Sequence, residues 1–189
     1  MQPAPYAHLN KGTLLIASPD IANEMLSRSV VLLCEHSSGG SFGLILNKPL
    51  PFDLQDELSV LDNIKNKNVL FTAGGPIQPS QMLLLHSDPN IEDQTVKICE
   101  SVFLGGDLQF LQEAINQEEG PNLHLVFGYL GWGPGQLEKE FLSGLWYLHP
   151  CRKELVFTKE SEKLWAKALK EMGGKYVSLS TIPTDLSVN

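Results

Sequence analysis

The sequence predicts a single domain of the α+β or mixed α/β class. Residues 29–35 and 42–46 are rich in β-branched residues and leucine, and they flank Ser37-Ser38-Gly39-Gly40, which is typical of a β-hairpin turn. Residues 107–117 and 160–172 show the spacing of amphipathic helices. Because strands and helices follow one another at irregular intervals, a regular strand–helix alternation around a parallel sheet is not favoured.

Length and composition support one domain that spans residues 1–189. Of the 189 residues, 42% are hydrophobic, so the chain can bury a core without a disulfide or a metal ion. Residues 1–10 show little periodicity and residues 176–189 are rich in Ser and Thr, so both are predicted to be peripheral. Apolar runs such as residues 82–85 are far shorter than the roughly 18 residues of a membrane helix. Because residues 1–10 also lack signal-peptide features, a cytoplasmic location without membrane insertion is predicted.

Net charge and cysteine usage exclude some classes of function. The formal net charge is -8 and the basic residues are scattered, which argues against direct binding to a nucleic-acid backbone. The three cysteines, Cys34, Cys99 and Cys151, are odd in number and contain no Cys-x-x-Cys pair, so a secreted disulfide framework is not indicated. They are expected to be reduced thiols of a cytosolic protein.

The remaining elements are predicted from short apolar runs, helical spacing and the positions of Gly and Pro. Asp107 is a suitable N-cap for the first amphipathic helix, and Gly173 is a suitable C-terminal stop for the second. Gly74-Gly75-Pro76 is predicted to be a tight turn between two strands. Strands are predicted at residues 13–17, 69–72, 81–86, 95–98, 101–104, 123–129, 145–148 and 155–157, and further helices at residues 21–26, 53–61 and 134–142, the last with Pro134 near its first turn.

Three stretches together resemble the AlgH/YqgE family of bacterial proteins. The longest is Gly128-Tyr129-Leu130-Gly131-Trp132-Gly133-Pro134-Gly135-Gln136-Leu137-Glu138, followed by Glu140 and Trp146. The others are residues 28–36 continuing to residues 43–49, and Gly74-Gly75-Pro76 followed by Leu85-His86. Their order and spacing agree with the family over about residues 12–173, which is most of the chain.

This resemblance implies a mixed fold in which a branched, mostly antiparallel sheet includes a small barrel and is flanked by helices. It also implies a cytosolic bacterial setting and an association with transcriptional regulation, but no particular reaction. Leu130 stands where the family tends to have a small residue, which indicates a different pocket around Trp132.

Polar and aromatic residues at predicted strand ends and turns form the candidate binding site. Sites on a rigid scaffold tend to lie at such positions. The alternative is structural, because Asn and Gln side chains commonly bond to turn backbone and a tryptophan in a glycine-rich turn has reason to pack. The candidate ligand-binding residues are His36, Asn47, His86, Trp132, Gln136 and Glu138.

The glycine-rich run at residues 128–135 joins a predicted strand to a predicted helix, where backbone amides can bind an anion. Its spacing matches neither a phosphate-binding loop nor a dinucleotide-binding motif. A tight turn that lets Trp132 pack against the backbone is therefore the favoured interpretation.

A thiol enzyme is the alternative to a binding protein. Cys34 and His36 stand two residues apart on a predicted strand, which would place the thiol and the imidazole on one face. A nucleophilic Cys34 or Cys151 would need a lowered pKa and a base, His36 or His86, within hydrogen-bond reach. His149 repeats the spacing with Cys151, so a zinc site would result if the two pairs met, although neither spacing matches a common zinc motif.

We therefore expect a cytosolic protein that binds a small molecule or a protein partner, with an indirect regulatory role and no direct binding to nucleic acid or membranes. No catalytic residue, metal ion or cofactor is assigned. The alternative is an enzyme that uses the Cys34/His36 region for thiol or hydrolytic chemistry. The sequence does not indicate the oligomeric state.

Overall fold

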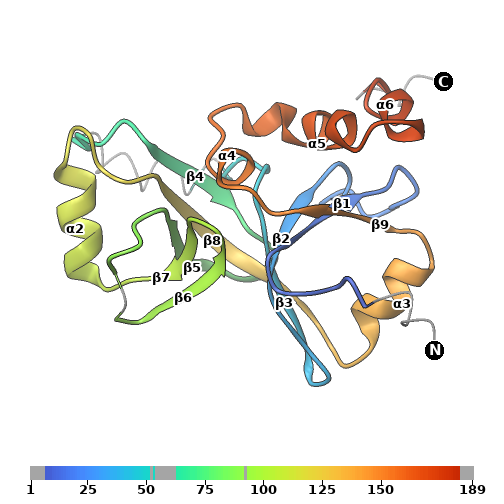
Figure 1. Ribbon diagram of the computed structural model, residues 1–189, viewed down its shortest axis with the longest axis horizontal. Helices are drawn as coiled ribbons and strands as arrows, with labels where there is room; N and C mark the ends of the chain where they lie inside the picture. The colour runs from blue at the N-terminus through green and yellow to red at the C-terminus, as the bar shows by residue number, and fades with distance from the viewer. Residues whose placement is uncertain (1–6, 52, 54–62, 92, 184–189) are drawn as a thin grey trace.

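The structure consists of one curled sheet and several short helices (Figure 1). The computed structural model describes residues 7–51, 53, 63–91 and 93–183. Within these residues the strands are β1 (Thr13–Ala17), β2 (Val30–Ser37), β3 (Gly40–Ile45), β4 (Val69–Ala73), β5 (Ile77–His86), β6 (Thr95–Cys99), β7 (Val102–Gly105), β8 (Leu123–Trp132) and β9 (Trp146–Pro150). The helices are α2 (Leu108–Asn116), α3 (Gln136–Leu142), α4 (Lys153–Val156), the 3-10 turn η2 (Ser161–Lys163), α5 (Leu164–Met172) and α6 (Lys175–Leu179).

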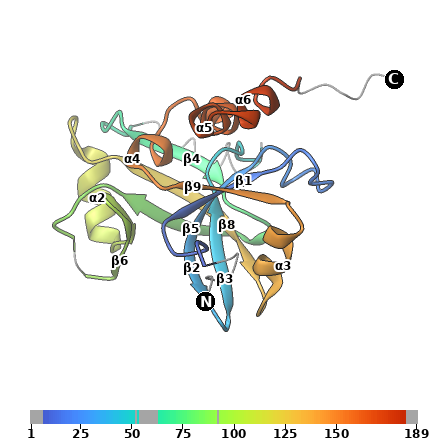
Figure 2. The same cartoon turned by 45° about the vertical axis from the view of Figure 1, so that its right-hand side comes forward.

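The sheet is mostly antiparallel and curls into a half-barrel, in agreement with the predicted α+β class (Figure 2). The strands follow the order β6-β7-β5-β8-β3-β2-β1-β9, and β4 joins β8 beside this path. Among the described residues every strand pair is antiparallel except β4 with β8. The predicted hairpin of residues 29–35 and 42–46 is confirmed as β2 and β3, which meet at the Ser37–Gly40 turn.

Three groups of buried side chains hold the helices against the sheet. The apolar side of α5 packs on β1 and β2, and the Trp165 indole donates a hydrogen bond to the Ala17 carbonyl at 2.8 Å. Leu137 of α3 packs on residues of β1, β2 and β8, and Phe110 of α2 packs on β5 and β8. No helix in the described ranges has the length and apolar character needed to cross a bilayer.

The predicted helix caps are confirmed. Asp107 is the N-cap of α2, and its carboxylate accepts a hydrogen bond from the Phe110 amide at 2.7 Å, which satisfies a free amide of the first turn. Gly173 is the C-cap of α5 with φ +72°, a backbone conformation that glycine adopts without steric cost. The structure adds α6, which the sequence pattern did not predict.

One predicted helix, at residues 21–26, is absent, and another, at residues 53–61, lies almost entirely outside the described residues. Residues 21–23 have no regular structure and residues 24–26 form a turn, because local side chains compete for the backbone amides: Asn23 Oδ1 accepts from the Met25 amide at 2.9 Å. The helix predicted at residues 53–61 lies outside the described residues apart from Asp53.

After β8, the type of one predicted element and the first residue of another also differ from the prediction. Residues 155–157, predicted as a strand, belong instead to the helical turn α4 and its C-cap, with the Arg152 carbonyl accepting from the Leu155 amide at 3.0 Å. A short apolar run does not by itself distinguish a strand from a buried helix. Pro134 lies outside α3, because Gly135 in a left-handed conformation is the N-cap and the helix begins after it.

The sheet branches in the middle of β8. Residues 123–127 of β8 lie between β4 and β5, whereas residues 130–132 pair with β3. The strands β3 and β4 therefore share one edge of β8, and β5 occupies the other edge. The Gly74-Gly75-Pro76 segment was predicted to be a tight turn, and this is wrong: it is a crossover that carries the chain across β8 from one edge to the other.

The crossover is close enough to require glycines. The Gly74 amide donates to the Phe127 carbonyl at 2.7 Å, so the two backbones are in direct contact. Gly128 has φ +75°, and a β-carbon there would lie 2.3 Å from the Gly75 carbonyl oxygen. A β-carbon at Gly74 would lie 2.3 Å from the Gly128 carbonyl oxygen. These separations are far inside van der Waals contact, so the chains can cross here only without side chains.

We predict that Gly128→Ala is much more damaging than Gly135→Ala. Gly135 has nearly the same φ, +73°, but nothing lies within 4 Å of a β-carbon built on it. Gly135→Ala should therefore cost only the left-handed backbone strain of about 1–2 kcal/mol. Gly128→Ala should lose at least about 2 kcal/mol more, because two backbones must also separate. Urea denaturation of both variants measures the difference, and equal losses would contradict the crossover argument.

His124 ties α4 to the sheet from a buried position. Its Nδ1 donates to the Val156 carbonyl at 2.9 Å, and its Nε2 then accepts from the Thr72 hydroxyl at 2.7 Å. Both ring nitrogens are thus used by the neutral imidazole. Burial lowers the pKa of His124 to about 4, although the hydrogen bond to Val156 acts in the opposite direction.

We predict that folding stability falls with pH between about 6.5 and 4. A histidine whose folded pKa is lowered contributes stability that is complete above its unfolded pKa of about 6.5 and is lost as pH falls toward its folded pKa of about 4. The difference corresponds to at most about 3 kcal/mol. The free energy of unfolding should fall less steeply between pH 6.5 and 5 in His124→Gln than in wild type. Parallel slopes in that range would show that His124 is not the group responsible.

Candidate functional site

The structure brings four of the six predicted site residues together, where the end of the β2–β3 hairpin meets α3. His36 Nδ1 shares a hydrogen bond with the Ser41 hydroxyl at 2.7 Å, and its Nε2 lies 3.7 Å from a carboxylate oxygen of Glu138. Gln136 accepts a hydrogen bond from the Gly133 amide at 3.0 Å, at the turn that leads into α3. The fourth residue, Trp132, lies beside them at the end of β8, where it also borders an open hollow over the hairpin.

Glu140, which was not among the predicted site residues, organises this cluster. Its carboxylate accepts hydrogen bonds from the indole of Trp132 at 2.9 Å, the indole of Trp146 at 2.8 Å and the amide of Gln136 at 3.3 Å. The two indole rings pack edge to face with centroids 6.3 Å apart. The carboxylate is therefore satisfied by three protein donors, and it fixes α3 against β8 and β9. The Gln136–Glu140 spacing of one helical turn was the signal available in the sequence.

Asn47 and His86 lie away from this cluster. Asn47 is buried just after β3, where its Oδ1 accepts from the Val30 amide and its Nδ2 donates to the Arg28 carbonyl, both at 2.8 Å. His86 pairs with Leu123 at the beginning of β8, whereas Trp132 is at the end of that strand. At about 3.3 Å per residue these ends are on the order of 25–30 Å apart. The six residues therefore do not line one common pocket.

His86 is buried in an aromatic setting. Its ring stacks on Phe103 with centroids 5.5 Å apart and meets Phe110 edge to face at 4.8 Å. Its Nδ1 accepts a hydrogen bond from the Asp88 amide at 3.3 Å. Burial lowers the pKa of His86, although Asp88 opposes this, so the ring is predominantly neutral at pH 7.

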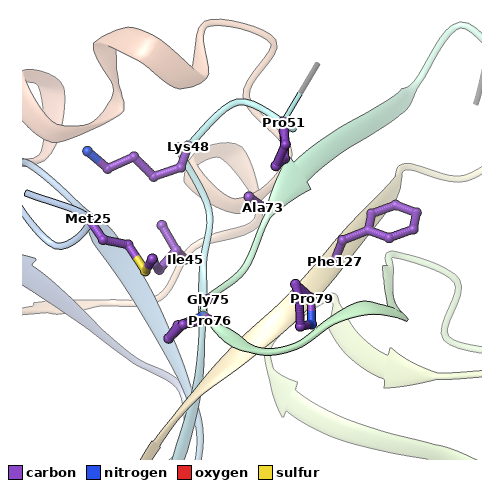
Figure 3. A pocket seen from close by; sticks show the side chains of 9 residues that line it. All are labelled: Met25, Ile45, Lys48, Pro51, Ala73, Gly75, Pro76, Pro79 and Phe127. Atoms are coloured by element: carbon purple, nitrogen blue, oxygen red, sulfur yellow. The ribbon is translucent and has the colours of Figure 1, made fainter. Parts of the chain in front are cut away.

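A separate apolar pocket of about 310 Å³ lies where β3, β4 and β8 diverge (Figure 3). Met25 and Ile45 stand on one side of it and Phe127 on the other. The branch of the sheet and the crossover create this opening, because β3 and β4 leave the same edge of β8 in different directions. The lining residues are Met25, Ile45, Lys48, Pro51, Ala73, Gly75, Pro76, Pro79 and Phe127.

One cation, Lys48, lines this pocket, and a second, Arg28, lies close enough to Lys48 for the two charges to interact. Lys48 is half-buried and its ammonium group donates to the Ser27 carbonyl at 2.6 Å, while its stem forms part of the pocket wall. Burial, and then the nearby Arg28 charge, lower the pKa of Lys48. Arg28 lies over the Trp165 ring, 4.7 Å from its centroid, and donates to the Ile182 carbonyl. Within the described residues, neither cation forms an ion pair with a carboxylate.

Asn47 supports this pocket without lining it. By bonding to Arg28 and Val30, it holds the backbone segment to which Lys48 also donates. The pocket itself was not predicted from the sequence. The signal available was the group of prolines in two segments that the fold brings together, at Pro51 and at Pro76 and Pro79.

Comparison with known proteins agrees with this geometry. A model of the protein family described as AlgH-like matches residues 14–177. This chain belongs to the AlgH-like family. The resemblance drawn from the sequence motifs is thereby confirmed.

Relatives of this AlgH-like chain match it along nearly the whole length. A UPF0301 protein of Chlamydia pneumoniae is 57% identical over 185 residues, covering 98% of each chain, and one of Chlorobaculum tepidum is 36% identical over 177 residues, covering 93% of each. A crystal structure of a protein from Corynebacterium diphtheriae has a TM-score of 0.73 at 21% identity, with 96% of this chain and 94% of that chain covered. The solution structure of AlgH from Pseudomonas aeruginosa has a TM-score of 0.70 at 22% identity, with coverage of 97% and 98%. At these identities the two structures show a common fold.

In this AlgH-like protein the thiol and imidazole of the enzyme alternative do not meet. A β-bulge between Leu33 and Glu35 interrupts the alternation of β2. Cys34 therefore points into the core under α5, whereas His36 points toward α3 on the other side. Burial raises the pKa of the Cys34 thiol, and its sulfur donates to the Leu32 carbonyl at 3.5 Å. Nothing in this geometry activates Cys34 as a nucleophile.

No zinc site was assigned from the sequence to the Cys34/His36 and His149/Cys151 pairs, and in the structure His149 has other contacts. His149 Nε2 lies 3.4 Å from a carboxylate oxygen of Glu171, and its Nδ1 donates a hydrogen bond to the Pro150 carbonyl at 2.8 Å. In the ranges that the structure describes, no three His, Cys, Asp or Glu side chains are grouped so as to hold a metal ion.

We predict that Trp132 contributes mainly to stability. The side chain is buried, and Trp132→Ala should lower the free energy of unfolding by about 3–5 kcal/mol, as for other buried aromatic side chains. Leu142→Ala on the exposed side of α3 is the control, and it should change stability by no more than about 0.5 kcal/mol. Urea denaturation measures both. A loss below about 1 kcal/mol for Trp132→Ala would instead indicate a role in binding.

Proposed function

We propose that this AlgH-like protein is a cytoplasmic binding module that takes a small apolar molecule with an anionic group. The ligand would occupy the pocket between β3, β4 and β8. The observation that carries this proposal is an apolar pocket lined by one cation, Lys48, whose charge is close to that of Arg28; neither has a carboxylate partner among the described residues.

The volume and chemistry of the pocket suit such a ligand. A volume of about 310 Å³ is at the lower end of the range for small-molecule sites, which are mostly apolar with a few polar groups. Met25 and Phe127 supply adaptable and aromatic surface on opposite sides, and three proline rings supply rigid surface. Rigid walls reduce the conformational entropy that binding would otherwise cost.

An anionic group on the ligand would reduce an unfavourable arrangement of charge. Lys48 and Arg28 repel each other, and partial burial further disfavours the charged form of Lys48. A carboxylate, sulfonate or phosphate between them would be attracted by both and could accept charge-assisted hydrogen bonds.

Binding is favoured over catalysis because few of the described side chains that line the pocket could act as an acid, a base or a nucleophile. Of the nine lining residues that the structure describes, Lys48 is the one titratable side chain, and none is a Ser, Cys or His. The described part of the lining therefore contains neither an acid–base couple nor a nucleophile with its base.

A regulatory role would follow if ligand binding changes the conformation of a surface that a protein partner binds. Arg28 also donates to the carbonyls of Ile182 and Pro183. A bound anion would compete with these carbonyls for the same guanidinium, and so couple the pocket to residues 182–183.

Binding of anilinonaphthalene sulfonate, an apolar dye with an anionic group, tests this proposal. We expect saturable binding that Lys48→Met weakens about tenfold, corresponding to about 1.4 kcal/mol for a charge-assisted contact. Lys159→Met, which removes an exposed lysine with no ion pair in the described residues, should leave affinity unchanged. Ala73→Leu should abolish binding by filling the pocket.

Melting curves of each variant establish that the fold is intact, because this dye also binds partly unfolded chains. Absence of binding to the native protein would overturn the proposal. Equal binding by wild type, Lys48→Met and Ala73→Leu would place the dye elsewhere and would also overturn it.

A further inference from the structure

The three cysteines, far apart in the sequence, gather at one place in the fold. Cys34 lies in β2, Cys99 is the last residue of β6, and Cys151 follows β9. All three pack against the core under α5. Cys34 is buried, whereas Cys99 and Cys151 are partly exposed. The apolar pocket between β3, β4 and β8 contains none of them, so the chemistry of these thiols does not depend on ligand binding there.

Gly12 brings Cys99 and Cys151 side by side. Its carbonyl accepts a hydrogen bond from the Cys151 amide at 3.1 Å. On the other side, a β-carbon at Gly12 would lie 3.3 Å from Cys99 Cβ and 2.6 Å from the Ile98 carbonyl oxygen. The end of β6 and the segment after β9 therefore contact the same glycine, which places the Cys99 sulfur where it can accept a hydrogen bond from the Cys151 thiol.

This contact joins the two ends of the sheet. The strand order begins with β6 and ends with β9, and the curl brings their ends together at Gly12. No ladder of backbone hydrogen bonds pairs β6 with β9 in the described residues. A covalent bond at this position would therefore connect the two edges that the sheet itself leaves unpaired.

The two thiols have different electrostatic surroundings. The hydrogen bond from Cys151 lowers the pKa of Cys99, with Lys97 acting in the same direction and burial and Glu100 opposing it. The same hydrogen bond, followed by burial, raises the pKa of Cys151. Cys99 is thus the better thiolate, and Cys151 is a neighbouring thiol that can resolve an oxidised Cys99.

We propose that Cys99 and Cys151 form a reversible disulfide on oxidation by a peroxide, which links the two ends of the sheet. The Cys99 thiolate attacks one peroxide oxygen, the O–O bond breaks, and Cys99 becomes a sulfenic acid while hydroxide leaves. The Cys151 sulfur then attacks the Cys99 sulfur, the S–O bond breaks, and the thiol proton leaves with the hydroxyl group as water. Two electrons pass from the thiols to the peroxide, and Cys34 remains a thiol.

The experiment treats the folded protein, at low micromolar concentration, with hydrogen peroxide. Titration of free thiols in denaturant should fall from three to one, and peptide mass spectrometry should identify a Cys99–Cys151 cross-link within one chain. The oxidised form should melt about 5–10 °C higher, because the bond closes a long loop, and dithiothreitol should reverse the shift.

Two variants test the assigned roles. In Cys151→Ser the sulfenic acid at Cys99 should persist and be trapped by dimedone, whereas in Cys99→Ser the same peroxide dose should leave Cys151 unmodified. Cys34→Ser is the control and should form the disulfide as wild type does. Three free thiols after a treatment that oxidises free cysteine would overturn the proposal. Cross-links that join separate chains or involve Cys34 would overturn it as well.

Discussion

The close crossing of Gly74 and Gly75 over Gly128 is the constraint on which the rest of the structure depends. It allows β4 and β5 to lie on opposite edges of β8 although they are consecutive in the sequence. It also frees the second half of β8 to pair with β3. The apolar pocket opens where these strands separate, so the same glycines that permit the crossing also determine where a ligand could bind.

The predictable parts of the fold are those determined by neighbouring residues. The β2–β3 hairpin and the Asp107 cap depend on a few consecutive side chains, and both were predicted. The role of Gly74-Gly75-Pro76 depends on a strand that follows about 50 residues later, so the local pattern indicated a turn. The bulge in β2 was another feature that the local pattern did not indicate. Its one extra residue places His36 on the face opposite Cys34, whereas regular alternation predicted one face for both.

The predicted site and the observed pocket consist of different residues, and the difference has a physical cause. His36, Trp132, Gln136 and Glu138 were selected for their polar and aromatic chemistry, and the fold does gather them. Most of their polar groups, however, bond to one another or to Glu140, and buried polar groups of a stable protein generally do so. The pocket is lined by residues with almost no hydrogen-bonding capacity, and such residues carry no recognisable motif.

The central position of β8 has a consequence for how the chain folds during synthesis. β3, β4 and β5 all precede β8 in the sequence, yet each of them pairs with it. A nascent chain must therefore leave an edge of each of these three strands unpaired until β8 has left the ribosome. Contacts of such high sequence separation slow folding, and unpaired strand edges favour aggregation. The interval between the synthesis of β5 and that of β8 is thus the period in which the growing polypeptide is most exposed to aggregation through these edges.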